Sequence, residues 1–237
     1  MEEPTASPAS DTNQRPLLQA YNLRRRSGEQ VLLDRVSIEI RQGERIAIVG
    51  PTASGKTLLL RALALLDPLN GGDVFWHGET VRRHDVPRYR SRVIYLHQRP
   101  ALLEGTVEEN LKFPFSLRIH SHRKFEIDAH RGWLASLNRD DSFLRKQQRD
   151  LSGGESQIVA LLRAMQLEPE ILLLDEPTSA IDAEATTAIE RLIDQWLRQQ
   201  PDQRATVWVT HDQQQAGRVA HHVLEMNTGA LSPRRPT

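Results

Sequence analysis

The stretch Gly50-Pro51-Thr52-Ala53-Ser54-Gly55-Lys56-Thr57 fits the sequence pattern G-x-x-x-x-G-K-[ST]. A short apolar run, Ile46-Ala47-Ile48-Val49, precedes it, and a longer one from Leu58 to Leu66 follows. This order predicts a buried parallel strand, a glycine-rich loop and a buried helix. In that arrangement backbone N–H groups converge on phosphate oxygens at the start of the helix. The alternative, a chance glycine-rich turn, does not account for Lys56-Thr57 or for the two apolar flanks.

This loop predicts two specific contacts. We expect Lys56 to reach the β- and γ-phosphates of a nucleotide and the Thr57 hydroxyl to coordinate Mg²⁺. The six residues before them, Gly50, Pro51, Thr52, Ala53, Ser54 and Gly55, complete the candidate cofactor-binding set.

A pair of carboxylates follows another apolar run, Ile171-Leu172-Leu173-Leu174. Ligands of open α/β sheets sit at the carboxyl ends of strands. We expect Asp175 to hold Mg²⁺ through water and Glu176 to orient or deprotonate an attacking water. The alternative is an acidic turn before a helix, because Pro177 and Thr178 also suit a helix start.

Two further polar residues follow predicted strands. His211 comes after Val207-Trp208-Val209-Thr210, where an imidazole can contact the γ-phosphate and the water. Gln98 comes after Val93 to His97, where its amide can bind Mg²⁺ or water. A structural histidine and a surface glutamine are the alternatives, and only the position beside the other motifs disfavours them. The candidate catalytic residues are therefore Glu176, His211 and Gln98, and the candidate metal ligands are Thr57, Asp175 and Gln98.

A second glycine-rich turn before a helix is Leu151-Ser152-Gly153-Gly154-Glu155. The chain then has two glycine-rich turns that can bind phosphate. Two such turns in one chain favour a protein whose second turn binds the nucleotide of a partner.

The segments between these motifs predict the order of domains. Residues 1–16 are rich in Pro, Ser, Thr and acid, which predicts a disordered tail. Strand patterns run to about residue 96, with a turn at His77-Gly78, and residues 99–165 have the pattern of a helical insertion. Strand patterns then return, and residues 229–237 are expected to be irregular. We expect an α/β fold over residues 17–228.

The composition excludes several classes. Lys plus Arg and Asp plus Glu both number 31, so no global charge favours nucleic acid or an anionic membrane. The absence of cysteine excludes disulfides, thiolate metal sites and a cysteine nucleophile, and fits the cytosol. No apolar stretch approaches the roughly 18 to 20 residues of a membrane span, and Met1-Glu2-Glu3-Pro4 does not resemble a signal peptide. We expect a protein that is soluble by itself.

A metal site and a solvated polar loop are the two alternatives for the region of His120, His122 and His130. We expect the loop, because these histidines lack carboxylate pairing and ligand spacing.

In their order and spacing, these motifs resemble the ATP-binding subunits of ABC transporters from about Leu17 to Met226. The resemblance implies a P-loop NTPase (RecA-like) core with a small antiparallel β subdomain and an inserted helical subdomain, and ATP and Mg²⁺ as cofactors. It implies a head-to-tail homodimer in which Ser152, Gly153 and Gly154 of one copy close over the γ-phosphate held by the other. Glu176 would be the catalytic base. A separate integral membrane permease would be the other partner, at the cytoplasmic face of the inner (plasma) membrane, and no nucleic acid would be bound.

Three segments show a narrower resemblance to Fet-type iron-export ATPases and a related aluminium-tolerance half-transporter. They are residues 103–111, Phe113-Pro114-Phe115 and residues 207–212. This resemblance implies metal (iron) export. Two departures stand beside it. Leu23 to Gly28 lacks the aromatic residue that stacks on adenine in many members, and Ser156-Gln157-Ile158 replaces the usual basic continuation of the signature.

Two other functions were weighed against transport. A soluble ABC ATPase that acts on DNA carries a long coiled coil between the two glycine-rich motifs, where this chain has no sustained heptads. Members that act on ribosomes carry two cassettes, and this chain has one. A regulatory nucleotide-binding module without turnover is disfavoured by the presence of Glu176 and His211. The sequence does not indicate the cargo.

Overall fold

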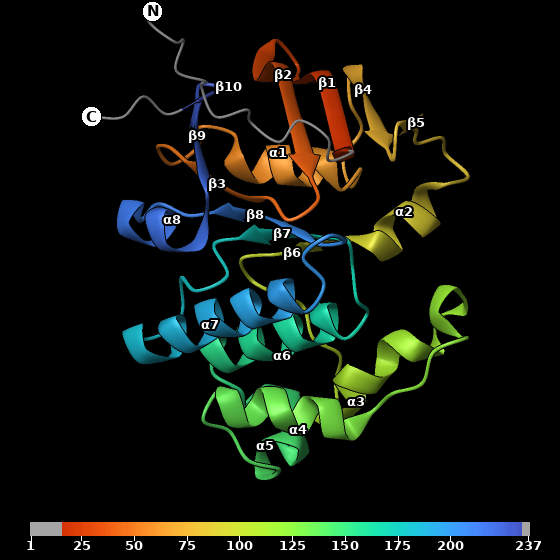
Figure 1. Ribbon diagram of the computed structural model, residues 1–237. Helices are drawn as coiled ribbons and strands as arrows, with labels where there is room; N and C mark the ends of the chain where they lie inside the picture. The colour runs from red at the N-terminus through yellow and green to blue at the C-terminus, as the bar shows by residue number, and fades with distance from the viewer. Residues whose placement is uncertain (1–15, 234–237) are drawn as a thin grey trace, which may run out of the picture.

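The computed structural model describes residues 16–233 and arranges them around two sheets (Figure 1). The elements in chain order are β1 (Pro16–Ser27), β2 (Gln30–Arg41), β3 (Arg45–Val49), α1 (Lys56–Leu63), β4 (Gly71–Trp76), β5 (Glu79–Thr80), α2 (Val86–Arg92), β6 (Val93–Leu96), α3 (Val107–Lys112), the 3-10 helices η1 (Phe113–Ser116) and η2 (Arg118–His120), α4 (Ile127–Ser136), α5 (Ser142–Arg145), the 3-10 helix η3 (Gln148–Asp150), α6 (Gly153–Met165), β7 (Ile171–Asp175), α7 (Ala183–Gln199), β8 (Ala205–Val209), α8 (Gln213–Val219), β9 (His222–Asn227) and β10 (Ala230–Pro233).

The central sheet has six strands in the order β10-β9-β3-β8-β7-β6. Its strands are parallel except β10, which pairs antiparallel with β9. All five residues of β7 are buried, because helices or the other sheet cover both faces of this strand. Ile171 and Leu173 face one hydrophobic cluster, while Leu172 and Leu174 face another, as the two-residue period of a strand requires.

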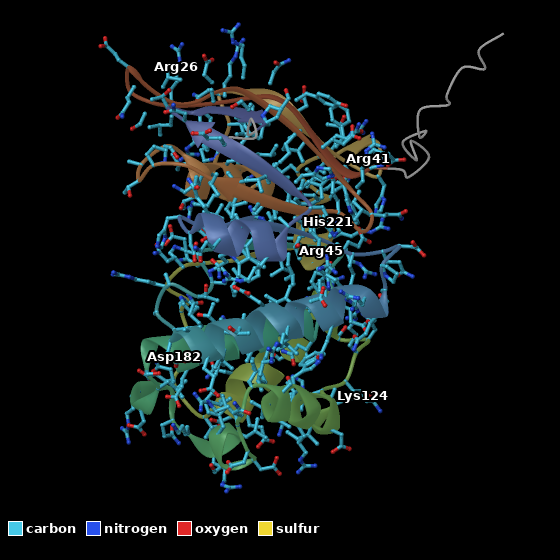
Figure 2. All side chains as sticks on the ribbon, turned by 60° about the vertical axis from the view of Figure 1, so that its left-hand side comes forward. Arg26, Arg41, Arg45, Lys124, Asp182 and His221 are labelled. Atoms are coloured by element: carbon cyan, nitrogen blue, oxygen red, sulfur yellow. The ribbon has the colours of Figure 1, made fainter. Side chains whose placement is uncertain are left out.

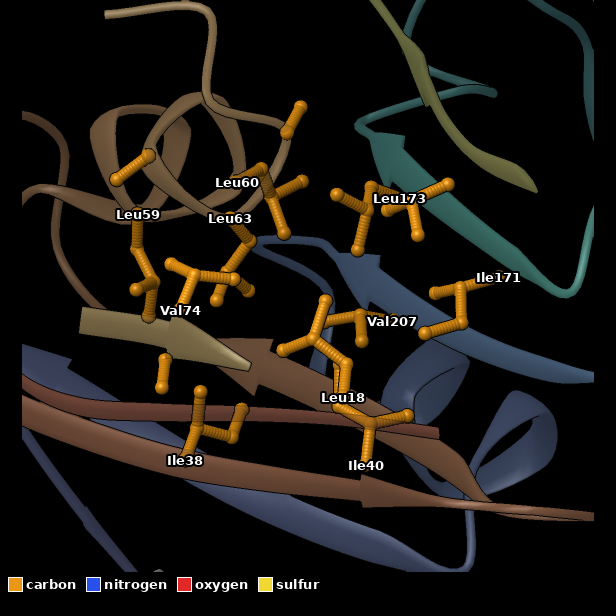
Figure 3. Packing of buried hydrophobic residues seen from close by; sticks show 14 of the residues in the cluster. Leu18, Ile38, Ile40, Leu59, Leu60, Leu63, Val74, Ile171, Leu173 and Val207 are labelled. Carbon is orange, nitrogen blue, oxygen red and sulfur yellow. The ribbon is translucent and has the colours of Figure 1, made fainter. Parts of the chain in front are cut away.

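The other sheet is antiparallel, in the order β2-β1-β4-β5. Figure 1 shows α1 between this sheet and the central one. Figure 3 shows the packing there, where Leu59, Leu60 and Leu63 of α1 meet Val74 and Ile38 of the antiparallel sheet. The strand predicted from the alternation of Val36, Ile38 and Ile40 is therefore confirmed, with its buried face on α1.

Below the central sheet in Figure 1, α6 and α7 form the next layer and α3, α4 and α5 the outermost one. Residues 99–165 are helical or irregular apart from an isolated bridge between Thr106 and Gln147, so the expected helical character of this region is confirmed. Both α3 and α6 begin with a capping box, Thr106 with Glu109 and Ser152 with Glu155.

Three expectations about secondary structure are wrong. Residues 86–92 form helix α2 and not a strand, because Pro87 lacks a ladder N–H but suits a first helical turn, and Tyr89 is buried against the core. Ala230–Pro233 form β10 and not an irregular tail, because Thr228 and Gly229 both have positive φ and close a two-residue hairpin. Pro16 is the first residue of β1 and not part of a tail. The other tail residues, 1–15 and 234–237, lie outside the described part.

No helix within residues 16–233 combines the length and the apolar character that crossing a bilayer requires.

Candidate active site

The glycine-rich loop at residues 50–55 joins β3 to α1. Its backbone needs glycine at both ends. Gly50 has φ 149°, and a Cβ there would lie 2.1 Å from the Met226 carbonyl oxygen. Gly55 caps α1 with φ 108°, and its Cβ would lie 3.0 Å from Cε of Met226. The loop thus packs closely against β9 and ends at the start of α1.

Lys56 lies inside this loop. Its Nζ donates to the carbonyl oxygens of Gly50 and Pro51, at 2.8 and 2.7 Å. Burial lowers the pKa of Lys56, and the nearby carboxylates of Glu176 and Asp175 oppose that shift. The hydroxyl of Ser54 is buried beside it and has no hydrogen-bond partner within the described residues. A buried cation and an unpartnered hydroxyl at a helix start fit the phosphate groups of a nucleotide.

The Thr57 hydroxyl and Asp175 adjoin the loop. Thr57 Oγ1 lies 3.1 Å from Oδ1 of Asp175, which is only 2% exposed. The other carboxylate oxygen, Oδ2, accepts a hydrogen bond of 2.8 Å from the hydroxyl of Tyr95. Hydroxyl and carboxylate oxygens are the ligands that Mg²⁺ takes. No cluster of three or more His, Cys, Asp and Glu side chains suited to a metal occurs in residues 16–233.

Sequence reasoning missed Tyr95. Its position in β6, three residues before Gln98 and beside β7, was the available signal, since β6 and β7 pair in parallel. Burial raises the pKa of Tyr95, so its hydroxyl stays protonated and donates to Asp175.

The structure brings the three candidate catalytic residues together. Gln98 Nε2 lies 3.0 Å and His211 Nδ1 lies 3.6 Å from the same oxygen, Oε2, of Glu176. Glu176 has φ 44°, an unusual value for a residue other than glycine, and its N–H donates to the Val209 carbonyl of β8. This backbone conformation is typical of residues held in place at functional sites.

A polar network behind this group was also missed. The buried side chain of Gln215 donates to Thr178 and accepts from Thr210, at 2.9 and 2.7 Å. It therefore ties the loop after β7 to the loop after β8, which carry Glu176 and His211.

The second glycine-rich turn lies at the start of α6. Ser152 Oγ accepts from the N–H of Glu155, and the Glu155 carboxylate accepts from the N–H of Ser152. A Cβ at Gly154 would lie 3.0 Å from the Ala180 carbonyl oxygen, and one at Gly153 would lie 3.5 Å from the Ala180 Cβ. Within the described part, no hydrogen bond or ion pair joins residues 152–154 to residues 50–57. Figure 1 explains this, because α6 and α1 lie on opposite faces of the central sheet.

Gln157, in the altered continuation of that turn, has a defined contact. Its buried side chain donates to the backbone carbonyl of Gln98 at 2.5 Å. The start of α6 is thereby connected to the candidate catalytic group.

The histidine-rich region differs from the expected solvated loop. His120 and His130 are 6% and 2% exposed. His130 bonds to the Glu126 carbonyl and to Gln166, and packs against Phe125 and Trp133. These two histidines are therefore part of the interior of the helical region, and the expectation is wrong for them.

Tyr21, an aromatic residue of β1 shortly before Leu23, is 44% exposed. It packs edge-to-face on Phe75.

Comparison with known proteins agrees with this geometry. Residues 33–179 match the family model described as "ABC transporter". The chain is 36% identical over 219 residues to "Sulfate/thiosulfate import ATP-binding protein CysA 2" of Rhizobium meliloti (strain 1021), an alignment covering 90% of the chain and 58% of that relative. It is also 36% identical over 197 residues to "Probable iron export ATP-binding protein FetA" of Escherichia coli (strain K12), which covers 83% of the chain and 85% of that relative. The chain thus spans only about three fifths of the length of the sulfate/thiosulfate relatives.

Solved structures show the same fold. A dimeric structure of the ATP-binding cassette MJ0796, in a post-hydrolysis state bound to ADP and Pi, matches with a TM-score of 0.77 and 25% identity over 93% of this chain and 100% of that chain. The cbiO1 structure from Clostridium perfringens matches with a TM-score of 0.75 and 21% identity, over 92% of this chain and 88% of that one.

Proposed function

The chain belongs to the ABC transporter family of ATP-binding proteins, and from this premise we propose that it binds and hydrolyses ATP to power transport through a separate membrane permease. The observation that carries the proposal is the convergence of Gln98 and His211 on the Glu176 carboxylate, at the same sheet edge as the Lys56 loop.

The residues of this edge have distinct roles in the proposed reaction. Lys56 and the loop N–H groups bind the β- and γ-phosphates. Glu176 accepts a proton from the water that attacks the γ-phosphorus, while the bond from that phosphorus to the ADP oxygen breaks and ADP leaves. Gln98 and His211 hold the Glu176 carboxylate and the water in position.

Thr57, Asp175 and Gln98 would hold Mg²⁺. When bound, the ion neutralises charge on the phosphate oxygens. Tyr95 fixes one Asp175 oxygen and leaves the other toward Thr57.

A second copy of the chain is the proposed partner that completes the site. Ser152, Gly153 and Gly154 lie at the start of α6 and do not bond to the loop of their own chain. Two copies packed head to tail would each offer this turn to the other's γ-phosphate, in a closed two-fold arrangement. The dimeric structure of the similar cassette MJ0796 supports this arrangement.

The proposed location is the cytoplasmic face of the membrane, on the permease. Relatives named for sulfate import and for iron export both support transport, and they differ in cargo and direction. We favour metal export, because Leu103 to Leu111 and Val207 to Asp212 resemble Fet-type iron-export ATPases and the FetA-named relative is 36% identical to the chain.

The test is phosphate release from ATP by the purified chain with Mg²⁺, together with identification of the membrane protein that copurifies with it. ATP binding without phosphate release would favour the regulatory module. Phosphate release with a copurifying partner that lacks membrane helices would favour a soluble ABC ATPase.

A further inference from the structure

Another charged site lies at the amino edge of the central sheet, opposite the edge that carries Glu176. Arg92, Glu170 and Arg204 each come directly before one of the neighbouring strands β6, β7 and β8. Because parallel strands begin at the same edge, these three side chains are brought together. With Arg123 and Glu168 they line a cavity of about 340 Å³.

A larger cavity of about 880 Å³ adjoins it under the helical region. Arg123, Glu168 and Arg204 line both cavities, so the two spaces meet at these residues. Lys124 lines the larger one, and Figure 2 shows it below the carboxyl end of α7.

Arg204 is the most unusual residue of this region. It is 3% exposed, and its guanidinium carbon lies 4.3 Å from the centre of the Trp196 ring. One nitrogen, Nη1, donates to the Trp196 carbonyl. Its Nε is buried without a hydrogen-bond partner, and within residues 16–233 no carboxylate lies within 4 Å of its nitrogens, although the charge of Glu168 acts on it. A buried charge is normally paired, because removing an unpaired charge from water is unfavourable.

Two carboxylates line the same cavity. Glu170 accepts hydrogen bonds from Trp76 Nε1 and His77 Nε2, both at 2.9 Å. Glu168 lies 3.6 Å from Arg123 and is about half exposed. Arg123 is itself fixed by a hydrogen bond of 2.6 Å from its Nη1 to the Leu167 carbonyl. The guanidinium groups of Arg92, Arg123 and Arg204 and the two carboxylates thus line the smaller cavity together, which leaves one positive charge in excess among these five groups.

We propose that these cavities bind a phosphate-type oxyanion between the guanidinium groups of Arg204 and Arg123. A tetrahedral oxyanion accepts several charge-assisted hydrogen bonds at once, which Arg204 lacks in its present surroundings. Either a free oxyanion or the phosphate group of a small monoester supplies this chemistry, and the cavity volumes admit both. The site is separate from the Lys56 loop, so it does not rest on the proposed ATPase function.

The test is a local one, because phosphate and sulfate also bind at loops such as residues 50–57. We would follow the arginine Nε–Hε signals of the full chain by NMR during titration with sodium phosphate, sodium sulfate, glycerol 3-phosphate or sodium chloride at matched ionic strength. The Arg204 signal is assigned by its loss in Arg204→Lys. Should that variant not fold, Trp196→Phe assigns it through the changed ring-current shift.

We expect phosphate or sulfate to shift the Arg204 signal saturably, with half-saturation on the order of 1 mM, while chloride gives no saturable shift. Arg123→Gln should weaken binding about tenfold, since a hydrogen bond to a charged group is removed. Arg149→Gln, an exposed arginine outside both cavities, should leave binding unchanged. Glycerol 3-phosphate that binds more than about tenfold tighter than phosphate would identify a monoester as the source. A linear response to all salts, or equal binding by wild type and Arg123→Gln, would overturn the proposal and leave the proposed ATPase function untouched.

Discussion

Gln98 Nε2 lies 3.0 Å from the Glu176 carboxylate, although the two residues follow different strands, β6 and β7. The contact exists because these strands are parallel neighbours, so the residues after them meet at one edge of the sheet. Gln98 is in turn joined through its backbone carbonyl to Gln157 of α6. A displacement of Gln157 can therefore be transmitted to the proposed catalytic base Glu176 through Gln98 alone.

Glu176→Gln should lower ATP turnover about 100-fold or more, because the amide cannot accept a proton from water. ATP affinity should stay within about threefold of wild type, since Lys56 and the loop are unchanged. Steady-state phosphate release and calorimetric ATP binding measure the two effects. Glu108→Gln, which removes an exposed carboxylate of α3, is the matched control. Unchanged turnover in Glu176→Gln would show that this residue is not the base.

Tyr95→Phe should raise the Mg²⁺ concentration needed for half-maximal turnover about tenfold or more. It removes the hydroxyl that orients Asp175 while keeping the ring, and one hydrogen bond to a charged group is worth roughly 1.5 to 3 kcal/mol. Calorimetric ATP binding at low and high Mg²⁺ gives a readout independent of turnover.

The control for that variant is Tyr89→Phe. The Tyr89 hydroxyl is buried and donates to the Leu63 carbonyl. Within the described residues it makes no hydrogen bond to Asp175. Its loss should lower the free energy of unfolding and leave the Mg²⁺ dependence unchanged. If turnover depended on Mg²⁺ equally in Tyr95→Phe and wild type, Tyr95 would have no role in binding the metal.

Stability should fall on acidification below about pH 6.5. Burial lowers the pKa of His130 below the ordinary histidine value of about 6.5, so the folded state binds fewer protons than the unfolded state below that pH. The free energy of unfolding then decreases as pH falls from 6.5 toward the lowered pKa, by at most about 1.4 kcal/mol per pH unit for one such group. Burial is also the main cause that lowers the pKa values of His120 and His221.

Urea unfolding at pH 7.5 and at pH 5.5 measures this effect. His130→Gln should have a smaller stability loss between the two pH values than wild type, because one titrating group is gone. His84→Gln, at an exposed position, serves as the control and should keep the wild-type pH dependence. A pH dependence of His130→Gln equal to that of wild type would contradict the assignment.

The sequence predicted those features that depend on short, local patterns. The loop at residues 50–57 has its glycines where the backbone requires them, and Gln98, Glu176 and His211 each follow a buried strand. Parallel pairing then brings these strand ends together without further information. The alternation of Val36, Ile38 and Ile40 likewise predicts which face of β2 is buried.

Other features depend on contacts between distant segments. The Tyr95 hydroxyl reaches Asp175 only because β6 and β7 are in register, and Gln157 reaches Gln98 only because α6 packs below β6. Helix α2 was missed because its decisive residue, Tyr89, bonds to Leu63 of another helix. The buried His130 bonds to Gln166, which follows α6 and is 36 residues away, and no local pattern predicts this contact.

The central claim is that Ser152 acts on the nucleotide of a second copy, and Ser152→Asp tests it most directly. Aspartate preserves the helix cap that Ser152 provides, while its charge would face the partner's γ-phosphate. Thr106→Asp, in the capping box of α3, is the matched control. We would measure ATP affinity in dilute protein and steady-state turnover for both variants. We expect Ser152→Asp to keep ATP affinity within about twofold and to lose turnover about 100-fold or more, while Thr106→Asp keeps both. Undiminished turnover in Ser152→Asp, or a loss of affinity as large as the loss of turnover, would contradict the central claim.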